Sequence, residues 1–192
     1  MSVTPTAPRY TRVAVILHWV IALLILGQLA GGLFFTNLSF ATHAELRISL
    51  TQFHKAVGLT VLVLSIARLI WRLTHRPPAL PVGMSRMEHM AAKATHILFY
   101  VLIIGIPLAG WLMVSAYKNP ISYFGVFNWP KIPGFEGQND FGEIMHEVHE
   151  YMAFAAIALI ALHIGAALKH HFINKDNVLA RMLPLVKARN KD

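Results

Sequence analysis

Four long apolar stretches constrain the fold of this chain more than any other feature of its sequence. Each stretch approaches or exceeds the roughly 20 residues that an α-helix needs to cross the hydrocarbon layer of a membrane. The stretches cover residues 13–35, 53–73, 93–114 and 151–168. Hydrophobic residues make up 56% of the 192-residue chain and charged residues only 14%, whereas a soluble domain carries about 25% charged residues. The sequence therefore predicts an all-α protein, a single four-helix transmembrane bundle.

The rest of the chain divides around this bundle. Residues 1–8 are polar, contain two prolines and are expected to be disordered. Residues 9–174 are predicted to form the transmembrane domain, and residues 175–192 a basic cytoplasmic tail. The first apolar stretch is longer than the 7–15 residues found in the core of a secretory signal peptide, so we interpret it as a membrane span.

The connections between the spans are predicted from their proline, glycine and polar residues. Residues 36–51 are expected to cross the outer surface, and residues 74–83 to form a cytoplasmic loop. Residues 117–142 make a longer outer loop, rich in aromatic side chains, that could lie on the membrane surface as a lid. Residues 169–177 are expected to continue as a short surface helix.

The basic residues are distributed unevenly between the two predicted sides of the membrane. Those at the termini and around the connection of the second and third spans are Arg9, Arg12, Arg68, Arg72, Arg76, Arg86, Lys93, Lys169, Lys175, Arg181, Lys187, Arg189 and Lys191. Those on the opposite side are Arg47, Lys55, Lys118 and Lys131. By the positive-inside rule both termini are expected to be cytoplasmic. Topology thus accounts for the net charge of +8 without a nucleic-acid partner.

The chain contains no cysteine and eleven histidines. The lack of cysteine excludes disulfides, cysteine-ligated iron–sulfur clusters and covalent attachment of a c-type haem. A haem in this protein would have to be held by histidine or methionine side chains alone. The histidines are therefore the candidate ligands.

The fourth apolar stretch carries a histidine near each end, His149 and His163, 14 residues apart. This separation is nearly four helical turns, so both imidazoles point to roughly the same side of the helix. Their levels differ by about 21 Å along the axis, which fits within a hydrocarbon layer about 30 Å thick. One helix could therefore supply an axial ligand to each of two stacked haems.

Topology supplies a partner for each of these histidines. The first span starts at the cytoplasmic side and the second at the outer side, which places His18 at the depth of His163, and His54 at the depth of His149. We call His18 and His163 the inner pair, and His54 and His149 the outer pair. Two imidazoles on facing helices are an established way to hold a b-type haem inside a bundle. A lone buried histidine often only hydrogen-bonds a neighbouring helix, but four that form two depth-matched pairs favour haem ligation.

His96, on the third span, begins at a depth similar to that of His18. Spacing alone leaves it open as the ligand opposite His163, as a donor to a haem propionate or quinone, or as a packing residue. His170, at the cytoplasmic surface, could snorkel or contact a propionate or quinone in the same way.

Cations next to the histidine pairs are candidates for binding haem propionates. Arg68 and Arg72 share one helix face at the cytoplasmic boundary, where they could also snorkel into the lipid headgroups. Lys55 lies beside His54 and could bind the propionates of an outer haem. It is also the candidate point of electron entry from the outer side.

At these residues the sequence resembles the bacterial cytochrome b561 family, the small dihaem cytochromes of the inner membrane. The matching motifs are His18-Trp19, His54-Lys-Ala-Val-Gly58, Arg68-Leu-Ile-Trp-Arg72, the run from His149 to His163, and the C-terminal segment from Lys169 to Pro184. The resemblance covers nearly the whole chain beyond residue 8. It implies that His18, His54, His149 and His163 ligate the haem irons, and that His96 lies outside the ligand set.

The resemblance also implies two haem b groups, electron transfer with a quinone such as ubiquinone, and a bacterial inner membrane. One member type oxidises superoxide at the outer side, so superoxide:quinone oxidoreductase is one expected activity, although the acidic outer loop opposes electrostatic capture of an anion. Related cytochromes anchor hydrogenases and formate dehydrogenases, which makes an anchor subunit with a redox partner protein the alternative. A rival from another class is a histidine-based proton or metal transporter without haem.

Overall fold

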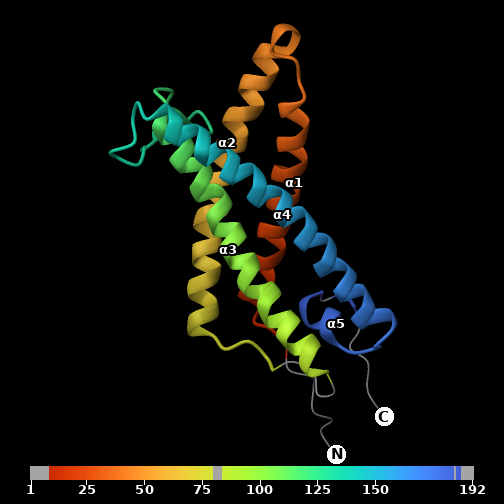
Figure 1. Ribbon diagram of the computed structural model, residues 1–192. Coiled ribbons are helices and arrows are strands. Elements are labelled where there is room, and N and C mark those ends of the chain that lie inside the picture. Colours follow the sequence, from red (N-terminus) through yellow and green to blue (C-terminus); the bar gives the residue numbers. More distant parts are fainter. Residues whose placement is uncertain (1–8, 80–83, 184, 187–192) are drawn as a thin grey trace, which may run out of the picture.

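A computed structural model describes residues 9–79, 84–183 and 185–186, so the predicted disordered segment 1–8 lies outside the described residues. The elements are α1 (Arg12–Thr36), α2 (Phe40–Thr74), α3 (Arg86–Ala116), β1 (Ile121–Tyr123), β2 (Phe127–Trp129), α4 (Asn139–Phe172) and α5 (Val178–Met182). Helices α1 to α4 are each long and apolar enough to cross a membrane, and they form one elongated bundle (Figure 1). The predicted four-helix transmembrane architecture is confirmed.

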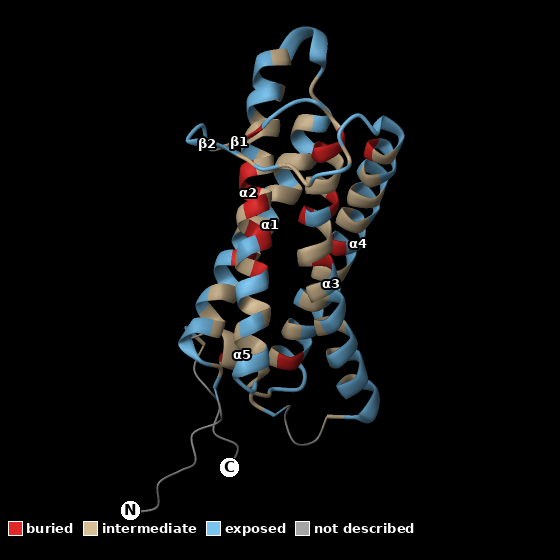
Figure 2. Ribbon diagram, turned by 90° about the vertical axis from the view of Figure 1, so that its left-hand side faces the viewer, coloured by how far each residue is buried: buried red, intermediate tan, exposed pale blue. Residues whose placement is uncertain are grey.

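The bundle is built from two helical hairpins. Helix α1 packs against α2, α3 packs against α4, and the hairpins meet chiefly where α2 packs against α3. The buried side chains accordingly gather on α2 and α3 (Figure 2), whereas Ile21 is the only buried residue of α1. Helices α1 and α4 expose large apolar side chains along most of their length, as expected of surfaces that face lipid.

The hairpin of α3 and α4 is fixed at both ends. At one end Gly142 lets the start of α4 approach α3 closely, because a Cβ atom there would lie 2.9 Å from the Tyr117 ring. At the other end Ser85 and Glu88 form a capping box at the start of α3, and Lys169 of α4 lies 2.8 Å from the Glu88 carboxylate. These contacts set the relative height of the two helices.

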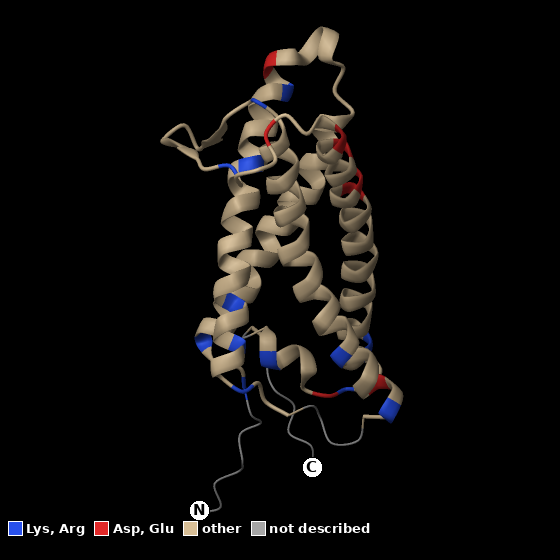
Figure 3. Cartoon of the chain, turned by 60° about the vertical axis from the view of Figure 1, so that its left-hand side comes forward, with Lys and Arg blue, Asp and Glu red and all other residues tan. Residues whose placement is uncertain are grey.

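We call the end of the bundle where α1 begins and α4 ends the inner end, and the opposite end the outer end. Lys and Arg residues gather at the inner end, while most Asp and Glu residues lie toward the outer end (Figure 3). This is the charge asymmetry on which the predicted orientation depends.

Two helices extend further at the outer end than the apolar stretches predicted. Helix α2 starts at Phe40, so much of the segment expected to cross the outer surface is helical, with a kink at His43. Helix α4 starts at Asn139, inside the expected outer loop. A 35-residue helix such as α2 is about 52 Å long, well beyond a hydrocarbon layer of about 30 Å. Hydropathy marks the part of a helix that lipid surrounds, and these extensions carry polar residues.

The remainder of the outer loop forms a small antiparallel hairpin in which Ile121 faces Trp129 across β1 and β2. The hairpin packs against α2, where the Tyr123 hydroxyl lies 3.0 Å from the Thr60 hydroxyl. The Trp111 indole of α3 donates to the Pro130 carbonyl at 3.0 Å. Ile121 is only 2% exposed and packs with Leu59 of α2 and Val114 of α3, so the β-hairpin covers the middle of α2 and the outer end of α3.

The inner end is closed by the C-terminal segment. The expected surface helix over residues 169–177 is wrong in its bounds, because α4 continues to Phe172 and α5 begins only at Val178. The Trp19 indole of α1 donates to the Met182 carbonyl at 2.7 Å, which attaches α5 to the bundle.

Candidate haem-binding histidine pairs

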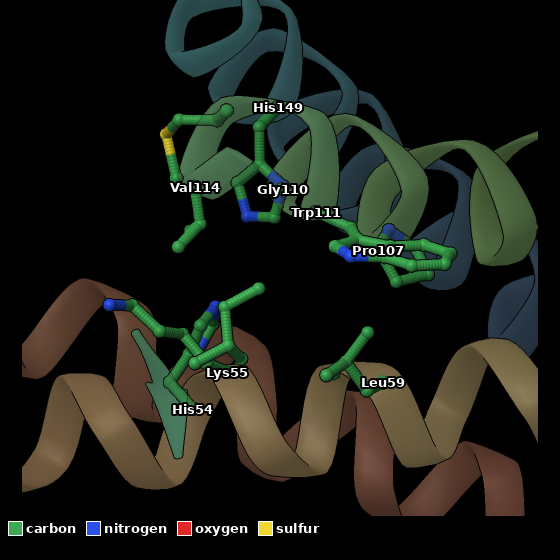
Figure 4. Close-up of a pocket in the computed structure, with 11 residues that line it drawn as sticks. His54, Lys55, Leu59, Pro107, Gly110, Trp111, Val114 and His149 are labelled. Carbon is green, nitrogen blue, oxygen red and sulfur yellow. The ribbon is translucent and has the colours of Figure 1, made fainter. Parts of the chain in front are cut away.

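The outer pair joins the two helical hairpins near the outer end. His54 of α2 and His149 of α4 face each other with ring centres 6.0 Å apart and ring planes at 72° (Figure 4). The structure therefore brings together the two residues that their predicted depth had matched.

The inner pair repeats this arrangement lower in the bundle. His18 of α1 and His163 of α4 have ring centres 6.4 Å apart, and their planes also meet at 72°. Since α1 and α4 are not among the closely packed helix pairs, the two imidazoles span a wider gap than ordinary packing would leave.

Both separations fit a metal ion held between the rings. An iron–nitrogen bond of about 2 Å and about 1 Å from that nitrogen to the ring centre give about 6 Å between the centres of two opposed imidazoles. If the rings only packed against each other, nothing would require the outer pair and the inner pair to have nearly the same distance between ring centres. The histidine residues thus fit two bis-imidazole haem sites.

A pocket surrounds the outer pair, and we call it the outer pocket. It is a hollow of about 420 Å³, partly open to solvent, between α2, α3 and α4, with Ile121 of the β-hairpin in its wall. Apart from the two histidines and Lys55, its lining is apolar or glycine: Gly58, Leu59, Pro107, Gly110, Trp111, Met113, Val114 and Ile121. A concave, mainly apolar pocket with a few polar groups is typical of a cofactor site.

The backbone of α3 fixes the orientation of His149. Its Nδ1 lies 2.8 Å from the Ile106 carbonyl oxygen, to which it can donate a hydrogen bond. Gly110 makes this approach achievable, because a Cβ atom there would lie 3.1 Å from Nδ1 and 3.2 Å from Cε1. A histidine that donates Nδ1–H to a carbonyl presents the lone pair of Nε2 to a metal.

His54 is held differently. Its ring lies edge-on to Phe35 of α1, with ring centres 5.2 Å apart, and its Nδ1 is buried without a hydrogen-bond partner among the described residues. The Gln28 side chain donates to the His54 carbonyl at 2.7 Å. This bond holds α1 to α2 beside the candidate ligand.

Aromatic rings and cations surround the inner pair. The His18 ring lies edge-on to Trp19, and the His163 ring edge-on to Phe99, with ring centres 5.2 Å and 5.1 Å apart. Arg68 donates to the Ala14 carbonyl of α1 at 3.1 Å. From there its charge acts on both imidazoles of the pair.

His96 and Arg72 lie at the edge of this inner site. The Arg72 guanidinium sits 5.8 Å from the Tyr100 ring centre, and its charge acts on His96. His96 also interacts electrostatically with His163. Among the described residues the imidazole in ring contact with His163 is that of His18, and the place of His96 outside the ligand set stays a prediction.

The fold, the paired histidines and the sequence comparisons point to one family. The family described as prokaryotic cytochrome b561 matches residues 9–185 of this chain. The chain belongs to the prokaryotic cytochrome b561 family. Haem binding, electron transport and a place in the lipid bilayer follow from this membership, and the four apolar helices fit a bacterial inner membrane.

Relatives in this cytochrome b561 family align with almost the whole chain. Cytochrome b561 homolog 2 of Escherichia coli (strain K12) is 34% identical over 184 residues, which cover 95% of each chain. Cytochrome b561 homolog 1 of the same strain is 28% identical over 92% of this chain and 97% of that protein. A protein of Yersinia pestis named probable superoxide oxidase CybB is 26% identical over 92% of this chain and 96% of that protein.

The remaining predicted site residues lie at both ends of this cytochrome b561 bundle. Lys55 lines the outer pocket. His170 is buried at the inner end, where its Nδ1 lies 2.6 Å from the Asp176 carboxylate and 3.3 Å from the Asn174 amide. His170 therefore holds the segment after α4 in place, a contact that spacing along the sequence did not indicate.

The sequence did not indicate the groups that orient the candidate ligands. The carbonyl of Ile106, Gly110 and Phe99 contact His149 or His163 from α3. No residue type predicts a carbonyl as a partner, because every residue has one. A glycine two turns before the end of an apolar helix was the one available signal, since small residues mark close approach between membrane helices.

Proposed function

We propose that this protein carries electrons across the membrane through two haem b groups, one held by each histidine pair, and exchanges them with a quinone. Each haem b would be held by the two imidazoles of one pair, and it would supply one-electron transfer. The observation that carries this proposal is the repetition of one geometry, at 6.0 Å and 6.4 Å between ring centres, on a single face of α4.

Each part of the chain has a separate task in this function. The helix α4 sets the spacing of the two sites, because His149 and His163 are about 21 Å apart along its axis. The Ile106 carbonyl orients His149. Arg68 and Arg72 at the inner site can neutralise the carboxylates of a haem there, and the aromatic and aliphatic walls exclude water from both sites.

The charge asymmetry supports an orientation with both termini in the cytoplasm. The outer pair would then exchange electrons with a periplasmic donor, and the inner pair would lie near the cytoplasmic leaflet. The quinone is expected from the hydrophobic part of the membrane at the inner site, where His96, Arg72 and His170 supply polar contacts.

Superoxide is a second candidate for the donor. Lys55 supports it, because this residue places a basic side chain in the wall of the outer pocket beside His54. The name of the Yersinia pestis relative also includes superoxide oxidation. Superoxide-dependent reduction of a ubiquinone analogue by the purified protein, lowered by Lys55→Gln, would support this donor; a rate that Lys55→Gln leaves unchanged would exclude Lys55 as the entry point.

The proposal is tested by the haem content and redox spectrum of the purified protein. We expect a ratio close to two haems per chain and a reduced-minus-oxidised spectrum with two components that titrate separately. A ratio of one would remove one histidine pair from the proposal. Colourless protein would favour a histidine-based transporter, although the described residues contain no group of three or more His, Cys, Asp or Glu side chains that could hold a metal ion.

The anchor-subunit alternative gives a different result. A cytochrome that serves a separate dehydrogenase should co-purify with that partner and should not turn over quinone without it. Steady-state quinone reduction by the isolated chain with a small-molecule donor would count against this alternative.

A further inference from the structure

A second hollow lies at the inner end of the bundle, and we call it the basic pocket. It is a hollow of about 450 Å³, partly open to solvent, where the start of α1 meets the end of α2 and the segment that follows. Its lining includes four arginines and the rings of Tyr10 and Trp71. The arginines are Arg9, Arg68, Arg72 and Arg76.

None of the four arginines forms an ion pair with an Asp or Glu side chain of the described residues. The ion pairs of the described residues are Lys131 with Glu136, Lys169 with Glu88, and His170 with Asp176. Four guanidinium groups around one hollow repel each other and create a strong positive potential. An anion that accepted hydrogen bonds from them would relieve this repulsion.

The four arginines differ in the direction in which their side chains point and in their exposure. Arg68 and Arg72 reach inward, toward the inner histidine pair and toward His96. Arg9 and Arg76 are exposed, one just before α1 and the other just after α2. These two exposed guanidinium groups are available to a ligand that arrives from the membrane surface.

The start of α1 is rigid at this place. The Thr11 hydroxyl caps the helix by accepting from the Ala14 amide at 3.2 Å, and it also accepts from the Trp71 indole at 3.0 Å. The contact joins α1 to α2 and fixes the backbone that leads to Arg9. The positive end of the α1 dipole adds to the field of the arginines.

An apolar surface runs along α2 toward the inner end of the bundle. It is a stripe of exposed side chains, spaced three or four residues apart, that ends at the residue after Arg72. Its members are Val63, Ile66, Ile70 and Leu73, which are 42–76% exposed. An anion with long hydrocarbon chains would therefore find a cationic pocket for its head and a hydrophobic track for its tails.

We propose that the basic pocket binds the phosphate of an anionic phospholipid, such as phosphatidylglycerol or cardiolipin, through Arg9 and Arg76. Basic pockets between transmembrane helices at the cytoplasmic side are suited to such headgroups. The proposal depends on the membrane position of the protein and not on the number or ligation of its haems. A bound lipid would hold α1 against α2 next to the inner histidine pair.

The test compares lipid retention by the full-length holoprotein and its variants. The protein is placed in phosphatidylcholine nanodiscs and titrated with phosphatidylglycerol, and lipid that remains bound after release is counted by native mass spectrometry. Removing two cations in Arg9→Gln/Arg76→Gln should weaken phosphatidylglycerol binding about 30-fold. The charge-retaining variant Arg9→Lys/Arg76→Lys should bind within a few-fold of the wild type, because lysine also binds phosphate.

The matched control removes two cations at the same end but outside the pocket. Arg86→Gln/Lys93→Gln changes two exposed residues of α3, and its binding should equal that of the wild type. Equal loss in both glutamine variants would show only general surface attraction and would overturn the proposal. Equally strong binding of inorganic phosphate would assign the pocket to a free anion and would also overturn it. The haem ratio of each sample, read from the same spectra, separates this outcome from any failure of the proposed electron transfer.

Discussion

The outer and inner histidine pairs have nearly the same ring geometry but different supports. In the outer pair, His149 is oriented by the Ile106 carbonyl and by the close approach of Gly110. In the inner pair, the rings are packed against Trp19 and Phe99, and Arg68 supplies a nearby charge. A hydrogen bond to the backbone fixes the orientation of a histidine, whereas a nearby cation would change the redox potential of a haem that the histidine binds.

This difference has a consequence for electron transfer. A positive charge near a redox centre stabilises its reduced form, and net charge and hydrogen bonding are among the factors that set haem potentials. Lys and Arg residues gather at the inner end, where Arg68 acts on the inner pair, while most Asp and Glu residues lie toward the outer end (Figure 3). We therefore expect the inner centre to have the higher potential, which favours electron flow from the outer end to the inner end.

The largest effect should follow from removing a ligand. His149→Ala should abolish the outer centre and leave about one haem per chain, because no other described histidine faces His54 across the pocket. His163→Ala should abolish the inner centre instead. Redox titration with haem quantification would distinguish them, with His146→Ala, an exposed residue on the same helix, as the control. Loss of the same component in both ligand variants would refute the pairing.

A smaller loss is expected when the outer ligand is displaced rather than removed. In Gly110→Ala the added methyl would press against the His149 ring, at 3.1 Å from Nδ1, and would weaken its bond to the Ile106 carbonyl. Loss of such an orienting contact typically reduces metal affinity about 10- to 100-fold. Haem retention during dilution would measure the change in the outer component.

Gly165→Ala provides the matched control for this substitution. It adds the same methyl group two residues after His163, where a Cβ atom meets nothing within 4 Å. Haem retention at both sites should stay as in the wild type. If Gly110→Ala also left the outer component unchanged, the α3 backbone would not be what positions His149.

The cation at the inner pair should affect potential rather than occupancy. Arg68→Gln removes a charge that acts on His18 and His163, and it should lower the midpoint potential of the inner centre by on the order of tens of millivolts. The outer potential should remain constant. Arg86→Gln, at the same end but outside the basic pocket, is the control. Equal shifts in the two variants would attribute the effect to overall charge.

The elements that sequence predicted well depend on hydrophobicity and helical period. The four spans and the common face of His149 and His163 follow from these two regularities, because lipid and helix geometry impose them directly. The assignment of His18 to His163 and of His54 to His149 followed from the direction in which each helix crosses the membrane. Such constraints act along one helix at a time, so they need no knowledge of side-chain packing.

The elements that sequence predicted poorly depend on contacts between distant segments. The outward extensions of α2 and α4 are polar, so hydropathy did not reveal them. The β-hairpin is held by contacts to α2 and α3. His170 pairs with Asp176, which lies beyond the turn that follows α4. In each case tertiary packing, rather than local preference, decides the structure.

The smallest effect concerns the hairpin that covers the outer pocket. Tyr123→Phe removes the hydroxyl contact with Thr60 at 3.0 Å, a loss of about 1 kcal/mol that should raise local opening roughly five-fold. Hydrogen exchange of the β1 and β2 amides would measure this, and the α4 amides around His163 should not change. Tyr151→Phe is the control, because that side chain is 71% exposed. An unchanged exchange rate would mean that the hydrogen bond from Trp111 to the Pro130 carbonyl and the packing of the Trp129 ring hold the β-hairpin in place without the Tyr123 hydroxyl.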